Sequence, residues 1–387
     1  MIKTIIATTE VLDNVYKAIN EILGSLNLKK NLLKNSVGII SCHADFIESG
    51  VVKNLCTALP FDCIGATTCL CSAGNRTSQM MLAITVLTSD DCSFETVEIP
   101  VIENHEDAVK AKLSPLLEKS QEKPALILSY FPFLITVGGD MLINAIDKVT
   151  GGIPLFGTVA FDIRENYSAS RTIHNGISSP ESVVLCLVRG NLKSTFLGTS
   201  NCTFEITTLE TKNIGHKATI TESKDNILIK VNDQPVLKYV EKYELKREEL
   251  HLGYLPLILD NNDGKRTIAR SLITVTQEGY IACGGTMPEG SSVSFGRIDG
   301  FAVINTTEKA LKPLLDKDHF ILSYSCMARY LAMGVNSLAE AEKVKEIVGN
   351  GKYMYACSAG EICPLPDKWG NLKNVFHNYT NVFCRIG

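Results

Sequence analysis

The sequence lacks the features that mark membrane proteins, exported proteins and nucleic-acid-binding proteins. No apolar run approaches the roughly 20 residues that a membrane-spanning helix needs. The apolar start, residues 1–8, is too short for a signal peptide and is soon followed by Glu10 and Asp13. The net charge is −4 without a basic cluster, so nothing resembles a surface for nucleic acid or anionic lipid. We therefore expect a cytoplasmic protein that binds no nucleic acid and does not insert into membranes.

The 13 cysteines lack the spacing of a metal site or a disulfide framework. Cys42-His43, Cys69-x-Cys71 and the pair Cys357 and Cys363 are the candidates, and none has the C-x-x-C or H-x-x-x-H spacing typical of zinc sites. We therefore predict no bound metal. The cysteines are interpreted as reduced thiols that pack as small apolar residues.

The sequence does contain one pattern that occurs three times. Each copy consists of a strand, a helix, a short strand with a small-residue loop, and a final strand. The copies begin near residues 37–40, 125–128 and 320–323, and their helices cover about 48–59, 139–149 and 337–348. Short apolar runs bounded by turn signals are typical of buried strands flanked by helices. We predict a mixed α/β (α+β) fold, with sheet-based domains built from repeated strand-helix-strand-strand modules covered by helices.

Two capping patterns support the predicted helices. Asn104 stands three residues before Asp107, and Ser337 stands three residues before Glu340. The second pair has the sequence of a capping box, in which the hydroxyl and the carboxylate satisfy free N–H groups at a helix start. We therefore predict a helix that begins at Ser337.

The chain between the second and third copies has a different pattern. Residues 217–231 predict a hairpin, and residues 235–249 predict a charged helix that opens at proline. We place the domain boundary in the polar stretch that precedes the hairpin. This gives an N-terminal domain of residues 1–210 with two modules, and a C-terminal domain of residues 211–387 with the hairpin, the helix and the third module.

The loops that follow the short strands are candidate ligand sites. They comprise residues 65–74, 157–162 and 357–361, and we hypothesise that they converge or occupy pseudo-symmetric positions. Open α/β sheets bind ligands at such strand ends. The first loop is rich in glycine and hydroxyl groups, which suit a small anion or zwitterion. It is not a phosphate-binding Walker A loop, because no lysine follows its second glycine. The alternative is a close-packed loop that needs small side chains.

Charged and polar residues gather near the end of the chain. Arg329 follows a strand, where a guanidinium either binds a carboxylate of its own protein or offers the same fork to a ligand. Glu361 is its expected internal partner or, alternatively, binds a ligand ammonium. Arg270 stands beside a strand in a similar position, and His377-Asn378 adds two hydrogen-bonding side chains. Both alternatives, internal salt bridge and ligand contact, stay open at this point.

These segments together resemble the FIST family, in which an N-terminal and a C-terminal FIST part follow each other. Residues 64–68 look like the family's Ile-Gly-x-Thr-Thr motif, and residues 156–162 look like its Gly-Gly-x-Ala-x-Asp motif with Thr158 in place of the second glycine. The C-terminal matches are Arg270 of the Val-Arg motif, the Pro-Glu-Gly turn at 288–290, Ser-Cys-x-Ala-Arg at 325–329, the Gly-Glu-Ile motif within 358–362, and the His-Asn pair at 377–378.

The resemblance implies an intracellular signal-input domain for a small ligand. Amino acids are the usual proposal for the family, and some relatives bind haem and sense nitric oxide. The sequence contains no kinase, cyclase, F-box or DNA-binding segment, so we expect the output to lie in a separate partner such as a histidine kinase or a cyclase.

We therefore predict a non-enzymatic sensor without a cofactor, in which Arg329 binds a ligand carboxylate and Glu361 binds a ligand ammonium. The predicted ligand-binding residues are Gly65, Thr67, Thr68, Asp162, Ser325, Cys326, Arg329, Ser358, Gly360, Glu361, His377 and Asn378. Three alternatives stay open. They are a haem-based nitric-oxide sensor with His377 or another histidine as axial ligand, a cysteine-dependent hydrolase-like enzyme, and a scaffold with a vestigial pocket.

Overall fold

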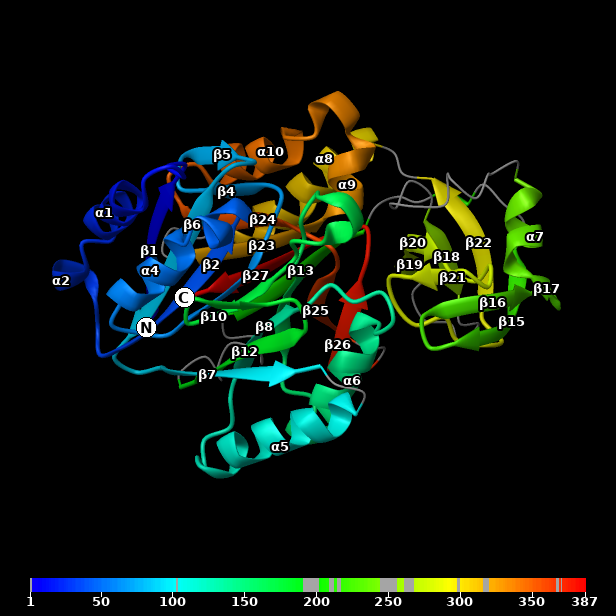
Figure 1. Cartoon of the computed structure of the whole chain (residues 1–387), viewed down its shortest axis with the longest axis horizontal. Helices are drawn as coiled ribbons and strands as arrows, with labels where there is room; N and C mark the ends of the chain where they lie inside the picture. The colour runs from blue at the N-terminus through cyan, green and yellow to red at the C-terminus, as the bar shows by residue number, and fades with distance from the viewer. Residues whose placement is uncertain are drawn as a thin grey trace.

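The computed structural model describes residues 2–101, 104–190, 202–208, 212–213, 217–243, 256–260, 268–297, 300–315, 320–366, 369 and 371–387. The larger part of the molecule has three six-stranded sheets, and the smaller part is one nine-stranded sheet with a helix against it (Figure 1). The predicted mixed α/β class is confirmed.

Each six-stranded sheet is built on one copy of the predicted module. In the first sheet, β2 (Asn35–Cys42) lies parallel to β3 (Cys63–Thr67) and antiparallel to β6 (Leu82–Ser89). The same arrangement recurs in the second sheet with β8 (Leu126–Phe131), β9 (Leu155–Val159) and β12 (Ser182–Arg189), and in the third with β23 (Phe320–Cys326), β24 (Lys352–Ser358) and β27 (Thr380–Ile386). One preceding strand is added to each sheet, namely β1 (Ile2–Thr9), β7 (Ser93–Pro100) and β13 (Cys202–Thr208).

The last two strands of every six-stranded sheet come from a different module. The hairpin β4 (Cys71–Ala73) and β5 (Arg76–Ser78) of the first module extends the third sheet, β10 (Thr172–His174) and β11 (Ile177–Ser179) of the second extend the first sheet, and β25 (Glu361–Pro366) and β26 (Leu372–His377) of the third extend the second sheet. The exchange is cyclic, so each module completes the sheet of another module and none completes its own.

The inner faces of the three sheets pack on one another and form the central core. Tyr130 of the second sheet and Tyr324 of the third are fully buried there, and their hydroxyls are hydrogen-bonded at 2.9 Å. This bond satisfies two polar groups that would otherwise be costly to bury. The outer faces are covered by helices: α1 (Val15–Leu26) and α4 (Val51–Ala58) on the first sheet, α5 (His105–Glu118) and α6 (Gly139–Thr150) on the second, and α8 (Gly300–Leu311) and α10 (Ala339–Val348) on the third.

The smaller sheet is an insertion ahead of the third module. A helix follows the preceding strand of each of the first two sheets, β1 or β7, whereas the elements of the smaller sheet lie between the preceding strand β13 and the helix α8. The predicted hairpin is confirmed as β15 (Ala218–Lys224) and β16 (Ile227–Val231). The other elements are β14 (Lys212–Asn213), β17 (Gln234–Pro235), α7 (Val236–Glu241), β18 (Leu257–Asp260), β19 (Ile268–Arg270), β20 (Leu272–Val275), β21 (Ile281–Cys283) and β22 (Ser292–Arg297).

Two predictions extend beyond the described residues. The predicted helix over 235–249 begins as α7 but ends at Glu241, and its residues 244–249 lie outside the described part. The predicted domain boundary between residues 210 and 211 also lies outside it, and its position stays a prediction. β13 precedes this boundary and pairs with β27 near the end of the chain.

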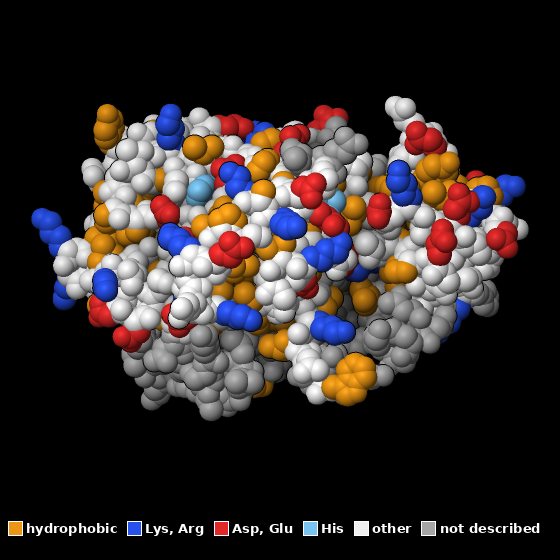
Figure 2. Space-filling model, turned by 90° about the horizontal axis from the view of Figure 1, so that it is seen from below, with side chains coloured by type: hydrophobic (Ala, Val, Ile, Leu, Met, Phe, Trp, Pro, Cys, Tyr) orange, Lys and Arg blue, Asp and Glu red, His pale blue; other side chains and the backbone are white. Residues whose placement is uncertain are grey.

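The surface has the mixed charge that the composition suggests. On the face shown in Figure 2, Lys and Arg side chains are interspersed with Asp and Glu, a distribution typical of a solvated surface. Among the helices within the described residues, none has the length and apolar character to cross a membrane.

One capping prediction is confirmed and the other is wrong. The Asn104 side chain accepts a hydrogen bond from the Asp107 backbone at 3.3 Å, as predicted for the start of α5. Ser337 does not cap α10, which begins at Ala339 without a side-chain cap. Glu340 is instead fully buried, because it pairs with an arginine inside the molecule.

Gly65 was predicted to bind ligand, and its position in β3 gives a structural reason for glycine. A Cβ at residue 65 would lie 2.0 Å from the Ile40 carbonyl oxygen, and one at the equivalent Gly157 would lie 1.7 Å from that of Ser129. We expect Gly65→Ala to lower the free energy of unfolding by about 1–3 kcal/mol, because the neighbouring backbone must move. Urea unfolding of the purified variant measures this loss.

Gly24 in α1 provides the matched control, because a Cβ there would meet nothing within 4 Å. Gly24→Ala should raise the free energy of unfolding by about 0.5–1 kcal/mol, since alanine is the better helix former. Equal effects of the two alanine substitutions would contradict the close strand approach at Gly65.

Candidate functional site

A cleft lies between the inserted sheet and the strand ends of the second and third modules. It contains about 380 Å³ of empty space, counted with the open solvent at its mouth. A second cavity of about 360 Å³ shares Phe133, Ile273 and Ala359 with the first. The two cavities are therefore arms of one cleft, which we call the interlobe cleft.

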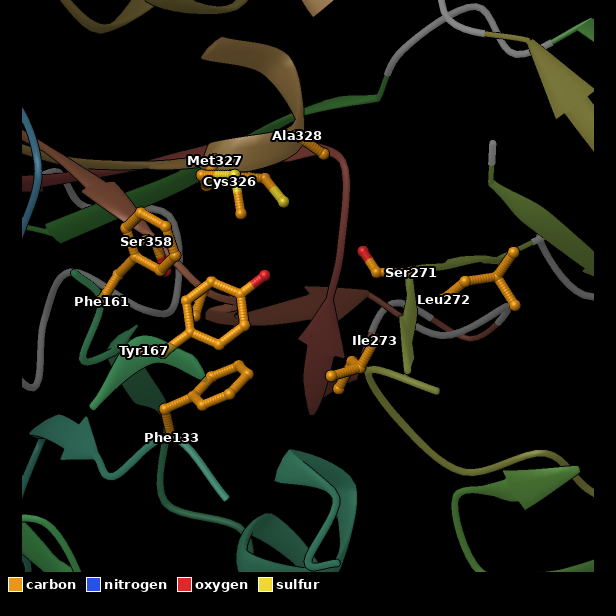
Figure 3. A pocket seen from close by; sticks show the side chains of 11 residues that line it. Phe133, Phe161, Tyr167, Ser271, Leu272, Ile273, Cys326, Met327, Ala328 and Ser358 are labelled. Atoms are coloured by element: carbon orange, nitrogen blue, oxygen red, sulfur yellow. The ribbon is translucent and has the colours of Figure 1, made fainter. Parts of the chain in front are cut away.

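Three walls bound the first arm (Figure 3). Phe133, Phe161 and Tyr167 form an aromatic wall on the side of the second module. The residues around the β23–α9 junction, 326–328, form a second wall together with Ser358 and Ala359 at the end of β24. The third wall, residues 271–273, belongs to the inserted sheet. Helix α9 (Met327–Ala332) thus begins at the cleft.

The aromatic wall depends on a loop that Asp162 holds in place. The Asp162 carboxylate accepts hydrogen bonds from the Arg164 and Ala169 backbone N–H groups at 2.7 and 3.0 Å, and from the Ser170 hydroxyl at 2.9 Å. Tyr167 lies within this loop at φ +55°, a conformation that bulky residues rarely adopt. Asp162 was predicted as a ligand contact, and the structure places it as the residue that positions Tyr167.

The three predicted loops do meet at one end of the molecule. The Phe161 backbone donates to the Thr67 carbonyl at 3.0 Å, and the Thr68 hydroxyl donates to the Cys357 carbonyl at 2.9 Å. The Thr158 hydroxyl donates to the Ser358 hydroxyl at 2.7 Å. The hydroxyls of the first loop are therefore used within the protein, and only the second and third loops reach the interlobe cleft.

Arg329 forms an ion pair with Glu340, which was predicted to cap a helix. Its guanidinium lies 2.6 Å from a carboxylate oxygen of Glu340, and both side chains are fully buried. The Ser325 hydroxyl also donates to Glu340, at 2.6 Å. Burial alone would raise the pKa of Glu340, but the charge of Arg329 and the hydrogen bonds outweigh it and lower that pKa. The predicted pairing of Arg329 with Glu361 is wrong.

The buried Arg270 forms a second ion pair, across the two parts of the molecule. It lies 3.0 Å from a carboxylate oxygen of Asp140 in α6, and it donates to the Phe376 carbonyl at 3.1 Å. The Thr286 backbone donates to the same Asp140 at 2.8 Å. Arg270 immediately precedes the Ser271 wall of the cleft, as Arg329 immediately follows the Ala328 wall. The two arginines thus hold opposite walls of the cleft in position.

Glu361 is buried with half of its carboxyl group unsatisfied. One oxygen accepts a hydrogen bond from the Thr380 hydroxyl at 2.7 Å, and the other has no partner among the described residues. Burial raises the pKa of Glu361 well above its usual value. The neutral acid is therefore favoured, and it is a weaker partner for a ligand ammonium than the predicted carboxylate.

Glu361→Gln should change how stability depends on pH. The folded pKa of Glu361 lies above the unfolded pKa, so its proton stabilises the fold below about pH 4.3 and this contribution is lost as pH rises through the folded pKa. Over that window the wild type should lose up to about 1.4 kcal/mol per pH unit relative to Glu361→Gln, which is neutral throughout. Urea unfolding of both proteins at a series of pH values tests this, and a pH-independent difference would contradict it.

The remaining predicted polar residues make contacts inside the protein. The His377 ring nitrogen Nε2 lies 3.0 Å from the Cys363 carbonyl oxygen, and Asn378 accepts a hydrogen bond from the Ser271 backbone at 3.2 Å. The Gly360 backbone accepts from Val159 at 2.9 Å. Asn378 and Gly360 thus join segments that carry cleft residues without lining the cleft themselves.

The cysteines at the site are poor nucleophiles. Cys326 lines the cleft, and burial raises the pKa of its thiol well above the usual value. The pKa of Cys357 is also raised, first by its contact with the Cys69 side chain and then by burial. The reactive form of cysteine is the thiolate, which these environments disfavour. The described residues contain no group of three or more histidine, cysteine or acidic side chains that could hold a metal ion.

Only part of the predicted set reaches the interlobe cleft. Of the predicted residues, Cys326 and Ser358 line it. The other ten do not line either arm: Gly65, Thr67, Thr68, Asp162, Ser325, Arg329, Gly360, Glu361, His377 and Asn378. Phe133, Tyr167 and the wall at 271–273 were not predicted, because they are scattered in the sequence. Phe161 belongs to the predicted loop 157–162. For the other cleft residues, the only indication in the sequence was that motif residues lie nearby.

Comparison with known proteins agrees with the resemblance seen in the sequence. A search of curated proteins found no match. The profile of the FIST N domain matches residues 36–234, and that of the FIST C domain matches residues 236–364. Since these matches cover most of the chain, the protein belongs to the FIST family of sensory domains, which bind small ligands in signal transduction.

Proposed function

We propose that this protein senses an amino acid or a similar small zwitterion, which binds in the interlobe cleft, and that it signals through a separate protein such as a histidine kinase or a cyclase. One observation carries the proposal: the cleft is lined by both the inserted sheet and the three-module core. A ligand in it contacts both parts at once. The ligand therefore binds more tightly to the conformation in which it contacts both the inserted sheet and the core than to one in which it contacts only one of them. A ligand that binds two conformations unequally shifts the equilibrium between them.

The chemistry of the cleft walls supports a small ligand that has both polar and apolar groups. The side chains of Ser271 and Tyr167 place hydroxyl groups among otherwise apolar walls, whereas the Ser358 hydroxyl is bonded to Thr158 and to the Gly360 carbonyl. A few polar groups on apolar walls are typical of pockets that bind and orient a small ligand.

The two alternative activities draw less support from the geometry. A thiol hydrolase needs an accessible thiolate, and the pKa of the cleft thiol Cys326 is raised by burial. The haem alternative needs His377 or another histidine as axial ligand. His377 lies outside both arms of the cleft and close to the Cys363 carbonyl, and no histidine is among the described residues that line either arm. FIST domains are a sensory family without known enzymatic activity.

Thermal unfolding of the purified protein with each of the twenty amino acids tests the proposal. A ligand at about 100 times its dissociation constant adds roughly 2.7 kcal/mol to the stability, so its effect on the midpoint is measurable. We expect stabilisation by a small set of chemically related amino acids. The absence of stabilisation by every one of them would overturn the proposal.

A blocking variant shows whether the effect arises in the interlobe cleft. Ala359 lines both arms, so Ala359→Leu should fill their junction and abolish the stabilisation. Ala58 at the exposed end of α4 supplies the matched control, and Ala58→Leu should leave the stabilisation unchanged. Stabilisation that persists in Ala359→Leu would place the ligand elsewhere.

A further inference from the structure

We infer that the part of the ligand that enters the interlobe cleft is an uncharged aromatic ring, so that the sensor responds to aromatic amino acids. This inference rests on the proposed function and specifies its ligand class. It is based on the charge of the walls, on the packing of the three rings, and on the strained loop that presents Tyr167.

The walls of the first arm are formed by uncharged side chains. No lysine, arginine, aspartate or glutamate is among the described residues that line it. The two arginines that adjoin its walls in the sequence are both engaged in ion pairs, Arg329 with Glu340 and Arg270 with Asp140. A charged ligand group placed here would lose its hydration without gaining an opposite charge, which is costly. The arm therefore favours an uncharged group.

The aromatic wall is continuous. The ring centroids of Phe133 and Tyr167 are 4.7 Å apart at an interplanar angle of 61°, and those of Phe161 and Tyr167 are 5.6 Å apart at 44°. These are the edge-on and tilted geometries in which aromatic rings attract one another, and a further ring extends such a cluster. The other two walls carry Met327 and Ile273, whose thioether and apolar groups pack well against a ring (Figure 3).

A cationic ligand group is the main rival, because ammonium groups also bind to aromatic faces. Such a group needs ring faces arranged around a gap, and a nearby carboxylate strengthens its binding. Here Phe133 and Phe161 both pack on Tyr167, so the rings contact each other. The Asp162 carboxylate is buried and hydrogen-bonded within its own loop. Both features favour a neutral ring over a cation.

Tyr167 has a left-handed backbone conformation, which is unfavourable for a bulky residue. Its φ of +55° is rare for a bulky residue, and strained residues of this kind cluster at ligand sites. Burial raises the pKa of its phenol to about 12, so the ring is neutral at physiological pH. Its hydroxyl points into the arm, toward the side on which Ser271 lies (Figure 3). The loop thus presents a neutral ring and a hydroxyl group to the space.

The experiment compares thermal unfolding and calorimetric titration for L-phenylalanine, L-tyrosine, L-tryptophan, L-lysine, L-glutamate, p-cresol and choline. We expect the aromatic amino acids to stabilise the protein and the charged amino acids and choline to have no effect. Tyr167→Ala should weaken binding of the aromatic amino acids about tenfold, since an aromatic contact is worth about 0.5–1.5 kcal/mol beyond its buried area. Tyr167→Phe should keep most of the affinity.

The control Tyr16→Ala removes a tyrosine that is 83% exposed on α1, and it should leave binding unchanged. If Tyr167→Ala does not fold by circular dichroism, Phe133→Leu serves in its place, because it removes a second ring of the same wall. An undiminished affinity in the folded ring variant would overturn the inference.

The outcomes separate this inference from the proposed function. Stabilisation by lysine, glutamate or choline without stabilisation by aromatic amino acids would overturn the inference. If the stabilising compound is lysine or glutamate, the proposal of an amino-acid sensor would still stand. Stabilisation by p-cresol alone would support an aromatic ligand and overturn the amino-acid proposal. No effect of any of the seven compounds would overturn the inference, and the remaining amino acids of the thermal-unfolding series would then decide the proposed function.

Discussion

Arg329→Ala is expected to destabilise the protein by about 3–5 kcal/mol, the cost of leaving a buried charge without its partner. Both Arg329 and Glu340 are fully buried, and the guanidinium also donates to the Val303 carbonyl at 3.2 Å and to the Thr307 hydroxyl at 2.9 Å. Its removal leaves the Glu340 carboxylate charged in the interior, with only hydroxyl and amide donors. The loss should therefore appear in stability first and in ligand binding only as a consequence.

Chemical unfolding of single and double variants measures this effect. Arg329→Met combined with Glu340→Leu replaces both charges by apolar groups, and it should be more stable than Arg329→Ala or Glu340→Leu alone. The exposed pair Lys343 and Glu346 supplies a control, because Lys343→Ala should cost only about 0–1 kcal/mol. An Arg329→Ala protein with wild-type stability and no ligand binding would contradict the structural role.

The second large effect is expected for the isolated fragment 1–210, which should not fold into a stable unit. In the whole protein, β25 pairs with β9, and the hairpin of β4 and β5 pairs with β24. The Ser72 hydroxyl of that hairpin bonds the Tyr353 hydroxyl, 281 residues further along the chain. The fragment therefore loses two of these exchanged pairings and exposes an unpaired strand edge, which favours aggregation.

Circular dichroism and chemical unfolding of the purified fragment test this prediction. We expect no cooperative transition for residues 1–210 alone, and recovery of one when residues 211–387 are co-expressed with them. The intact chain is the control. A fragment that unfolds cooperatively by itself would show that the exchanged hairpins are not needed to complete the N-terminal sheets.

Local sequence patterns were sufficient to predict the three modules, because each strand is a short apolar run with turn signals beside it. The exchange of hairpins could not be predicted, since it depends on pairings such as Glu361 with Thr158 between distant segments. A hairpin such as 71–78 has the same local sequence whichever sheet it joins. The fold class followed from local information, whereas the order of strands within the sheets required long-range contacts.

The candidate site shows the same limit. Glu340 has the spacing of a capping residue, and only the packing of α10 reveals that its side chain turns inward to Arg329. The motif residues mark the right region, because Arg270 and Arg329 adjoin two walls of the cleft. The aromatic wall combines Phe133, Phe161 and Tyr167, which no spacing rule connects. A residue that contacts a ligand and a residue that only holds such a residue in place can have the same motif in a sequence.

Hydrogen–deuterium exchange of the whole protein with and without L-phenylalanine tests whether the ligand binds in the interlobe cleft. We expect slower exchange in three separate segments: the wall at 271–273, the start of α9 at 326–328, and the Tyr167 loop at 161–171. Ala359→Leu should abolish the protection and Ala58→Leu should retain it. Protection by the ligand that spares all three segments and appears elsewhere would contradict the assignment of the interlobe cleft as the sensory site.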